Sequence, residues 1–319
     1  MGYFQMLRRG VSRASGRSYW SQTQGLGRLF RPGELHGYFN DLTAKAAWHG
    51  ETDIQGNPIS VVGGVKCYWP TTVLQKGLAH WDLWLESGRS AEEHLQGFQA
   101  AAQWACDSQD TIGGWRHPVA LHPLAQSKYS CISQGQGASI LARAFRQTGQ
   151  TRYLDAARGA LQAMLLPKSS GGTAVYSGDS LILEEYPART LNPVLNGWIF
   201  AIFGLYDFGL VAADEEASRA LSRTTQTLCD WLPRFDCGFW SMYDDGETIA
   251  SQFYHRLHIA QLDALCLTFR DRNPAFTLQR ERFSNQLSSD LNKSRAFAIR
   301  IVQKLGRPAL TPMQSSLSG

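Results

Sequence analysis

The 319-residue chain lacks paired cysteines, a long apolar run and a strong charge of either sign. Its six cysteines lie far apart, with no C-x-x-C pair and no metal-type spacing, a pattern typical of reduced thiols in a reducing compartment. No segment approaches the roughly 18–20 apolar residues that a membrane span needs. The net charge of +4 permits an acidic partner without demanding one.

The chain also lacks signals for export, lipid attachment and nucleotide binding. Its first twenty residues carry basic side chains but no apolar core of a signal peptide, and Met6 stands where a myristoylation signal has Ser or Thr. The segment GGVKCYWP, residues 63–70, has no phosphate-loop lysine followed by Ser or Thr. We therefore expect a cytoplasmic protein with no membrane span, no nucleic-acid partner and no cofactor.

The chain does contain a weak internal repeat of paired helical patterns. The first helices of the first three pairs carry Gly77, Gly137 and Gly197, which are 60 residues apart, and each pair is followed by a glycine-aromatic stretch. The pairs are 71–87 with 90–107, 133–147 with 151–165, 194–213 with 215–232, and 254–269 with roughly 275–303. Helical hairpins at such a period, with glycine-rich returns, are typical of an α/α toroid.

We therefore predict an all-α fold, an (α/α) toroid of helical hairpins with inner first helices and outer second helices. Residues 1–60 should form a partly extended arm, with a β-hairpin, that packs on the toroid. Residues 61–305 should form the toroid itself, and residues 306–319 a flexible tail.

The stretch LEEYPARTLNPVLNG, residues 183–197, joins two acids to a phenol. Pro187 removes a backbone donor and favours an extended Tyr186, so Glu184, Glu185 and Tyr186 should lie on a loop before a helix. Tyr243 and Tyr254 flank the next connection, and in a toroid these loops meet at one mouth. Tyrosine, with an ordinary pKa of about 10, suits proton exchange with a carbon acid.

Several motifs resemble one enzyme family. SQGQGASILARAF, LEEYPARTLNPVLNGWIFAIFGLYD, FWSMYD and YHRLHIAQLDAL together resemble the C-terminal domain of D-glucuronyl C5-epimerases, and YWPTTVLQKGLAHWDLWLES resembles that family's YP-x-Q-x-GL helix. The resemblance covers roughly residues 60–270. It implies an isomerase that converts D-glucuronic to L-iduronic acid in a heparosan-like polymer. The expected partner is an acidic polysaccharide, and a homodimer is compatible with this interpretation.

The resemblance also implies catalytic roles for Glu185, Tyr186, Tyr243 and Tyr254. Inverting C5 of a uronic acid needs two proton-transfer groups on opposite faces of the sugar, for which we expect Glu185 and Tyr254, with Tyr186 and Tyr243 as orienting groups or proton relays. The dianionic intermediate also needs a cation or several hydrogen-bond donors at the carboxylate. The family has an arginine at the position of Gly246.

The missing arginine requires another cation, for which Arg189 ranks above Lys128 and Arg256. The full predicted substrate-binding set is Asn196, Arg189, Gln134, Gln136, His258, Arg256 and Trp115. Some members have a structural alternative: Asn196 could cap a helix, the glutamines could serve a helix N-terminus, and Trp115 could fill the core. His255 and His258 lack a third ligand at metal spacing, so we predict no metal and expect them to contact substrate or pack. Glu184 is expected to pair structurally with an arginine.

Two other functions fit the same residues. A polysaccharide lyase begins with the same C5 proton abstraction and then expels the C4 substituent, which creates a double bond. A toroid that only binds acidic polysaccharide would exchange no proton at C5. Ultraviolet absorbance of the product and deuterium exchange at C5 distinguish these functions from an epimerase.

Overall fold

A computed structural model describes residues 22–62, 64–118, 125–246, 248–269 and 274–306. The helices form four consecutive hairpins, as the repeat predicts, and the all-α fold is confirmed. The hairpins pair α2 (Pro70–Glu86) with α3 (Glu92–Asp107), α4 (Cys131–Thr148) with α5 (Thr151–Leu165), α6 (Leu195–Gly209) with α7 (Glu215–Trp231), and α8 (Gln252–Thr268) with α9 (Pro274–Ser288). A last helix, α10 (Asp290–Gly306), packs on α8 and α9. None of the helices in the described ranges is long and apolar enough to cross a membrane.

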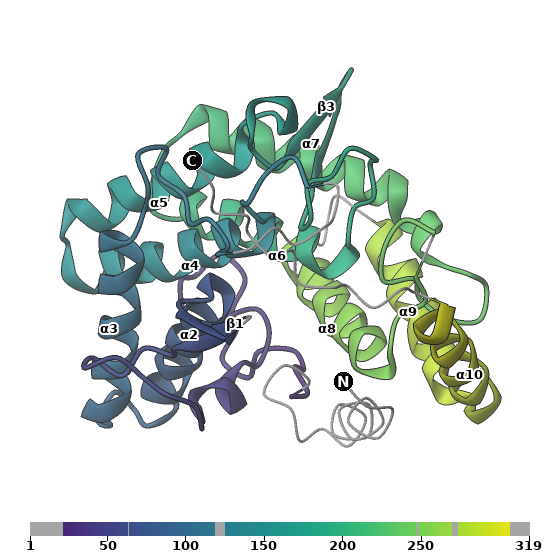
Figure 1. Cartoon of the computed structure of the whole chain (residues 1–319), viewed down its shortest axis with the longest axis horizontal. Coiled ribbons are helices and arrows are strands. Elements are labelled where there is room, and N and C mark those ends of the chain that lie inside the picture. The colour runs from purple at the N-terminus through teal and green to yellow at the C-terminus, as the bar shows by residue number, and fades with distance from the viewer. Residues whose placement is uncertain (1–21, 63, 119–124, 247, 270–273, 307–319) are drawn as a thin grey trace.

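The first helices of the hairpins pack in sequence, α2 on α4, α4 on α6 and α6 on α8. They follow an arc that runs from α2 and α3 at one end to α8, α9 and α10 at the other (Figure 1). In the described part of the chain, α2 and α8 do not form a packed pair of this kind, so the hairpins make an open arc and the closed ring of a toroid is not observed.

Local signals set where these helices begin and end. Pro70 opens α2, where its missing N–H costs nothing. The Asp214 and Ser251 side chains cap α7 and α8 by accepting hydrogen bonds from the Ala217 and Tyr254 amides. Gly149, at φ 71°, ends α4 in the left-handed conformation and allows the short turn into α5.

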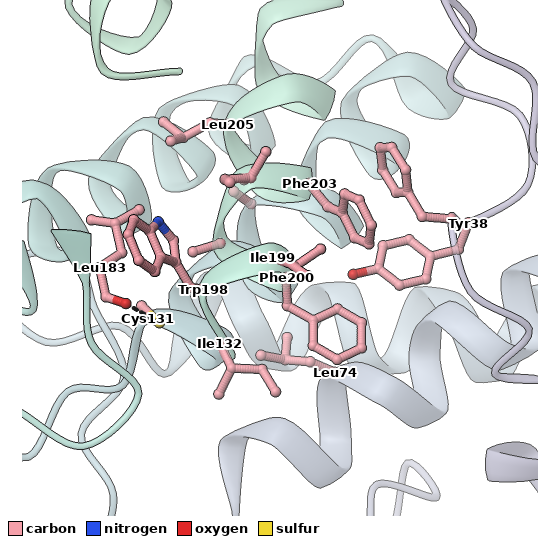
Figure 2. Packing of buried hydrophobic residues seen from close by; sticks show 14 of the residues in the cluster. Tyr38, Leu74, Cys131, Ile132, Leu183, Trp198, Ile199, Phe200, Phe203 and Leu205 are labelled. Carbon is pink, nitrogen blue, oxygen red and sulfur yellow. Dashed lines mark hydrogen bonds between the residues drawn. The ribbon is translucent and has the colours of Figure 1, made fainter. Parts of the chain in front are cut away.

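The core is centred on α6, which is buried nearly all round (Figure 2). Its Gly204 packs against Gly135 of α4, where a Cβ atom would lie 2.3 Å from the Gly135 carbonyl oxygen. Phe203 stacks on Phe39 of the N-terminal segment with ring centroids 4.0 Å apart. The Tyr38 ring lies between the helices beside Phe200 (Figure 2). The N-terminal segment is thus part of the hydrophobic core.

Two short antiparallel hairpins and three 3-10 helices complete the described fold, the latter including η3 (Lys168–Ser170) and η4 (Leu232–Phe235). The first hairpin joins β1 (Ser60–Val62) to β2 (Val65–Cys67), so it begins at the last residue of the predicted arm. The 3-10 helix η2 (Thr43–Ala46) lies within that arm and packs on α2. The sequence analysis missed the second hairpin, β3 (Ala174–Ser177) with β4 (Ser180–Leu183), which turns at Gly178. The expected flexible tail lies outside the described residues except for Gly306, which ends α10.

Candidate active site

A cavity of ≈ 1680 Å³ lies where the N-terminal ends of the four inner helices meet. Each helix contributes residues from its first turn or its cap: Trp69 and Thr71 for α2, Ser130 and Ile132 for α4, Asn196 for α6, and Ser251 and Tyr254 for α8. Unpaired N–H groups and the helix dipole make helix N-termini favourable for anions. The inner helices therefore direct four partial positive charges toward the cavity.

The loop after β4 places Glu185 and Tyr186 at the cavity wall. The backbone anchors this loop on both sides, because the Cys131 amide donates to the Glu184 carbonyl (3.2 Å) and the Gln126 amide donates to the Pro187 carbonyl (2.9 Å). The Glu184 side chain points away from the cavity and forms a buried ion pair with Lys168, with 2.6 Å between Nζ and Oε2. Glu184 thus forms an ion pair, as expected for a structural acid, and the partner seen here is Lys168.

Glu185 lies on the other side of the loop and packs against α6. At Gly197 a Cβ atom would lie 2.4 Å from Glu185 Oε2, so only glycine leaves room for the carboxyl group. Burial raises the pKa of Glu185 to about 7, although its hydrogen bond with Tyr186 opposes the shift. A carboxyl group with this pKa is close to half ionised at neutral pH, which suits a general base.

The three tyrosines lie together beside Glu185. The Tyr186 and Tyr243 hydroxyls are 3.2 Å apart, and the Tyr243 and Tyr254 rings pack with centroids 4.6 Å apart. Burial and the nearby Glu185 raise the pKa of Tyr186 and of Tyr243 well above 10, so both hydroxyls stay protonated. Backbone hydrogen bonds fix Tyr243, whose amide donates to Thr248 and whose carbonyl accepts from Leu195. All four predicted catalytic residues line the same cavity.

Two predicted binding residues also line the cavity, Asn196 and Arg256. Asn196 is 4% exposed, and its Oδ1 has no hydrogen-bond partner among the described residues. A buried amide oxygen without a partner is costly, and a hydrogen-bond donor of a ligand in the cavity would satisfy it. The Arg256 side chain is exposed at the cavity edge.

The structure places the other predicted binding residues away from this cavity. Gln134 exchanges hydrogen bonds with the Trp115 backbone (3.2 and 3.0 Å), and the buried Trp115 indole donates to the Ala105 carbonyl (3.0 Å). Gln136 is fully buried within α4. Arg189 and the alternative cation Lys128 are exposed and do not line the cavity, because their segments turn these side chains to solvent. Our ranking of Arg189 as the carboxylate-binding cation therefore lacks structural support.

The histidine pair is held by bonds within the protein. The Ser241 hydroxyl lies 2.8 Å from His255 Nδ1 and 2.9 Å from His258 Nδ1, and His255 Nε2 lies 3.0 Å from the Phe283 carbonyl oxygen. The His255 ring stacks on Trp240 with centroids 3.7 Å apart. Burial lowers the pKa of His255 to about 4 and that of His258 further. Both histidines, and Trp240 with them, have a packing role in this geometry.

Sequence reasoning missed several polar residues of the cavity wall. Lys45 of η2 lines it and is 1% exposed, and burial lowers its pKa to about 8. His117 also lines it, with Nε2 3.0 Å from the Ser133 hydroxyl, and burial lowers its pKa to about 4. Nothing in the local sequence marks either residue. Sequence reasoning also missed the basic residues of α10. These residues repeat at helical spacing, so that pattern could have identified them.

On this helical-hairpin fold, a buried carboxyl group and three tyrosines line one cavity, an arrangement that is chemically suited to proton transfer. The family model described as D-glucuronyl C5-epimerase C-terminus matches residues 109–284, and the chain belongs to this family. It is 30% identical over 194 residues to the D-glucuronyl C5-epimerase of Caenorhabditis elegans, covering 53% of this chain and 31% of that protein. It is 29% identical over 154 residues to an uncharacterized protein of Methanocaldococcus jannaschii, covering 46% and 50%. The chain therefore spans only a third to a half of these relatives.

Proposed function

We propose that the protein is a polysaccharide C5-epimerase that converts D-glucuronic to L-iduronic acid residues in a heparosan-like polymer. The observation that carries the proposal is the contact of the buried Glu185, whose pKa is about 7, with a connected group of partly buried tyrosines. Family membership supports the reaction type. The basic side chains among the described lining residues and the helix N-termini at the cavity support an anionic substrate.

In the proposed reaction, the Glu185 carboxylate takes the C5 proton of the uronate and becomes neutral. The electron pair passes into the C6 carboxylate, which becomes an enediolate with two negative charges and is stabilised by the surrounding donors. The Tyr254 hydroxyl then gives its proton to C5 from the opposite face. Net proton return from Glu185 to the Tyr254 phenolate runs through the Tyr186 and Tyr243 hydroxyls, which are 3.2 Å apart.

Exchange in heavy water tests this proposal directly. The enzyme is incubated with heparosan and with a small panel of other uronate polymers, and proton NMR follows loss of the C5 signal and growth of L-iduronate signals. We expect both on at least one polymer. Ultraviolet absorbance from a new double bond would identify a lyase instead, and a protein that binds polymer without any exchange would be a carbohydrate-binding module.

A further inference from the structure

A second pocket, of ≈ 550 Å³, lies beside the active-site cavity at the segment that leads into α2. Tyr68 and Pro70 line this pocket, whereas their chain neighbours Trp69 and Thr71 line the cavity. Trp69 has an extended backbone (φ −101°, ψ 108°), and successive side chains of an extended chain point to opposite sides. One segment of chain therefore separates the two spaces, which share no lining residue in the described ranges.

Aromatic rings form one wall of the second pocket. The Tyr68 ring packs against the Trp104 ring with centroids 5.6 Å apart, and the Trp115 ring stacks on Trp104 with centroids 6.5 Å apart. Tyr68 is 38% exposed, and its hydroxyl donates to Asp53 Oδ2 (2.9 Å). Neighbouring groups thus fix a partly exposed aromatic surface, which can pack against the apolar face of a ligand.

A fixed turn also borders the second pocket. Asp53 Oδ1 accepts hydrogen bonds from the Gln55 and Asn57 amides (2.9 and 2.8 Å), and Oδ2 accepts one from Asn57 Nδ2 (3.1 Å). The turn holds the exposed side chains of Ile54 and Gln55 at the pocket. The fold therefore fixes the backbone of this border before any ligand binds.

The charges of the second pocket disfavour an acidic ligand. Its charged residues, among those described, are Asp53, Asp107 and Arg116. Arg116 pairs with Asp110 (2.7 Å), whereas the exposed Asp107 accepts a hydrogen bond from the uncharged Gln103 side chain. Asp107 also ends α3, and the last carbonyl groups of a helix carry a partial negative charge. The active-site cavity is different, because helix N-termini face it.

We propose that the second pocket binds an uncharged sugar unit. The aromatic wall packs against the sugar ring, and the Asp107 carboxylate and the Gln55 amide oxygen accept hydrogen bonds from its hydroxyl groups. A uronate would place its carboxylate beside Asp53, Asp107 and the end of α3, so the pocket selects against the sugar that the cavity binds. The volume is within the range of about 300–1,000 Å³ that is typical of ligand pockets. The inference rests on the proposed function only in taking the substrate to be a polysaccharide.

Binding of uncharged oligosaccharides tests the second pocket without reference to turnover. Wild type, Tyr68→Ala, Tyr68→Phe and Asp107→Ala are titrated with maltotriose and with tri-N-acetylchitotriose by calorimetry. Tyr176→Ala is the matched control, because Tyr176 is also exposed, donates its hydroxyl to the Leu165 carbonyl (2.7 Å) and lines neither space. Circular dichroism checks that each variant is folded.

We expect wild type to bind at least one of these probes, with a Kd that rises about three- to tenfold in Tyr68→Ala and in Asp107→Ala. Tyr68→Phe keeps the ring and should change the Kd by less than about twofold, as should the control. Four results would overturn the proposal: no binding of either probe, unchanged affinity in both folded variants, equal losses in Tyr68→Phe and Tyr68→Ala, or Tyr68-dependent binding of an oligogalacturonate but of no uncharged probe.

Competition with heparosan distinguishes two sources of the uncharged sugar. If the sugar is a unit of the polymer that reacts, heparosan displaces the bound trisaccharide, and Tyr68→Ala raises KM for the polymer more than it lowers kcat. If the sugar belongs to a separate saccharide, the trisaccharide and heparosan bind at the same time. Self-association of wild type that Ile54→Ser abolishes, in a protein whose affinity for both probes does not depend on Tyr68, would assign this surface to a second copy of the chain and overturn the proposal.

C5 exchange and binding at the second pocket can be lost independently. Wild-type protein that exchanges C5 protons but binds no uncharged sugar refutes the second pocket alone. Binding of uncharged sugars that depends on Tyr68, in a protein that exchanges no C5 proton on any polymer, refutes the epimerase proposal and leaves the second pocket standing.

Discussion

Replacing Glu185 with glutamine should stabilise the protein while abolishing its turnover. An unfolded glutamate has a pKa of 4.5, whereas burial raises the pKa of folded Glu185 to about 7. Between these two values the folded protein holds a proton that the unfolded chain has lost, so the free energy of unfolding falls as pH rises through this window. At about 1.4 kcal/mol for each pKa unit, the loss is about 3 kcal/mol above pH 7. Glutamine stays neutral and avoids this loss.

Urea denaturation of both proteins at pH 4 and pH 8 measures the effect. We expect equal stability at pH 4 and a variant more stable by about 3 kcal/mol at pH 8. Glu184→Gln is the control, and it should change the free energy of unfolding in the opposite direction. It breaks the buried ion pair with Lys168 and should therefore destabilise the protein by about 3 kcal/mol or more. A Glu185→Gln variant that is destabilised equally at both pH values would show that the carboxyl group is not held in a desolvating site, and the argument for its role as base would fail.

Three further changes test the rest of the site. Tyr254→Phe removes only a hydroxyl and should reduce turnover by about 10²–10⁴-fold with the fold intact, so a loss below about tenfold would contradict its role as acid. Gly197→Ala should displace Glu185 and reduce turnover, whereas Gly209→Ala on the same helix, with nothing within 4 Å, should not. Equal activity in the two alanine variants would argue against a fixed Glu185. A chelator should leave turnover unchanged, because His255 and His258 are held by Ser241; activity lost on chelation and restored by metal would refute this.

The helical hairpins and the grouping of the catalytic residues follow from short-range sequence signals. The 60-residue spacing of the inner glycines reflects close packing that the structure explains at Gly197, where the missing side chain makes room for Glu185. Pro187 and the acids before it mark the loop, and Tyr243 and Tyr254 are separated only by the return that brings α8 to the cavity. These features depend on residues that lie close together in the chain, so they can be predicted from a single sequence.

The cations of the cavity depend on packing between distant segments, which the sequence does not reveal. Arg189 is close to Glu185 in the chain, yet the loop turns its side chain to solvent. Lys45 belongs to a short 3-10 helix that reaches the cavity by packing on α2, and no periodic pattern points to it. Gln134 faces the Trp115 backbone because its position on α4 directs it into the core. Proximity in sequence was therefore a poor guide to proximity in space.

The residues that line the cavity decide where the chain can be cut without opening the site to water. The family match covers residues 109–284, but Lys45, Trp48 and Thr71 before it and Arg300 after it all line the cavity. A fragment cut at the matched boundaries would keep Glu185 and the three tyrosines and lose the walls that shield them from water. Water at Glu185 would return its pKa toward that of an ordinary glutamate, and the carboxylate would become a much weaker base. Boundaries drawn from sequence similarity would thus preserve the catalytic side chains and discard the environment that gives them their chemistry.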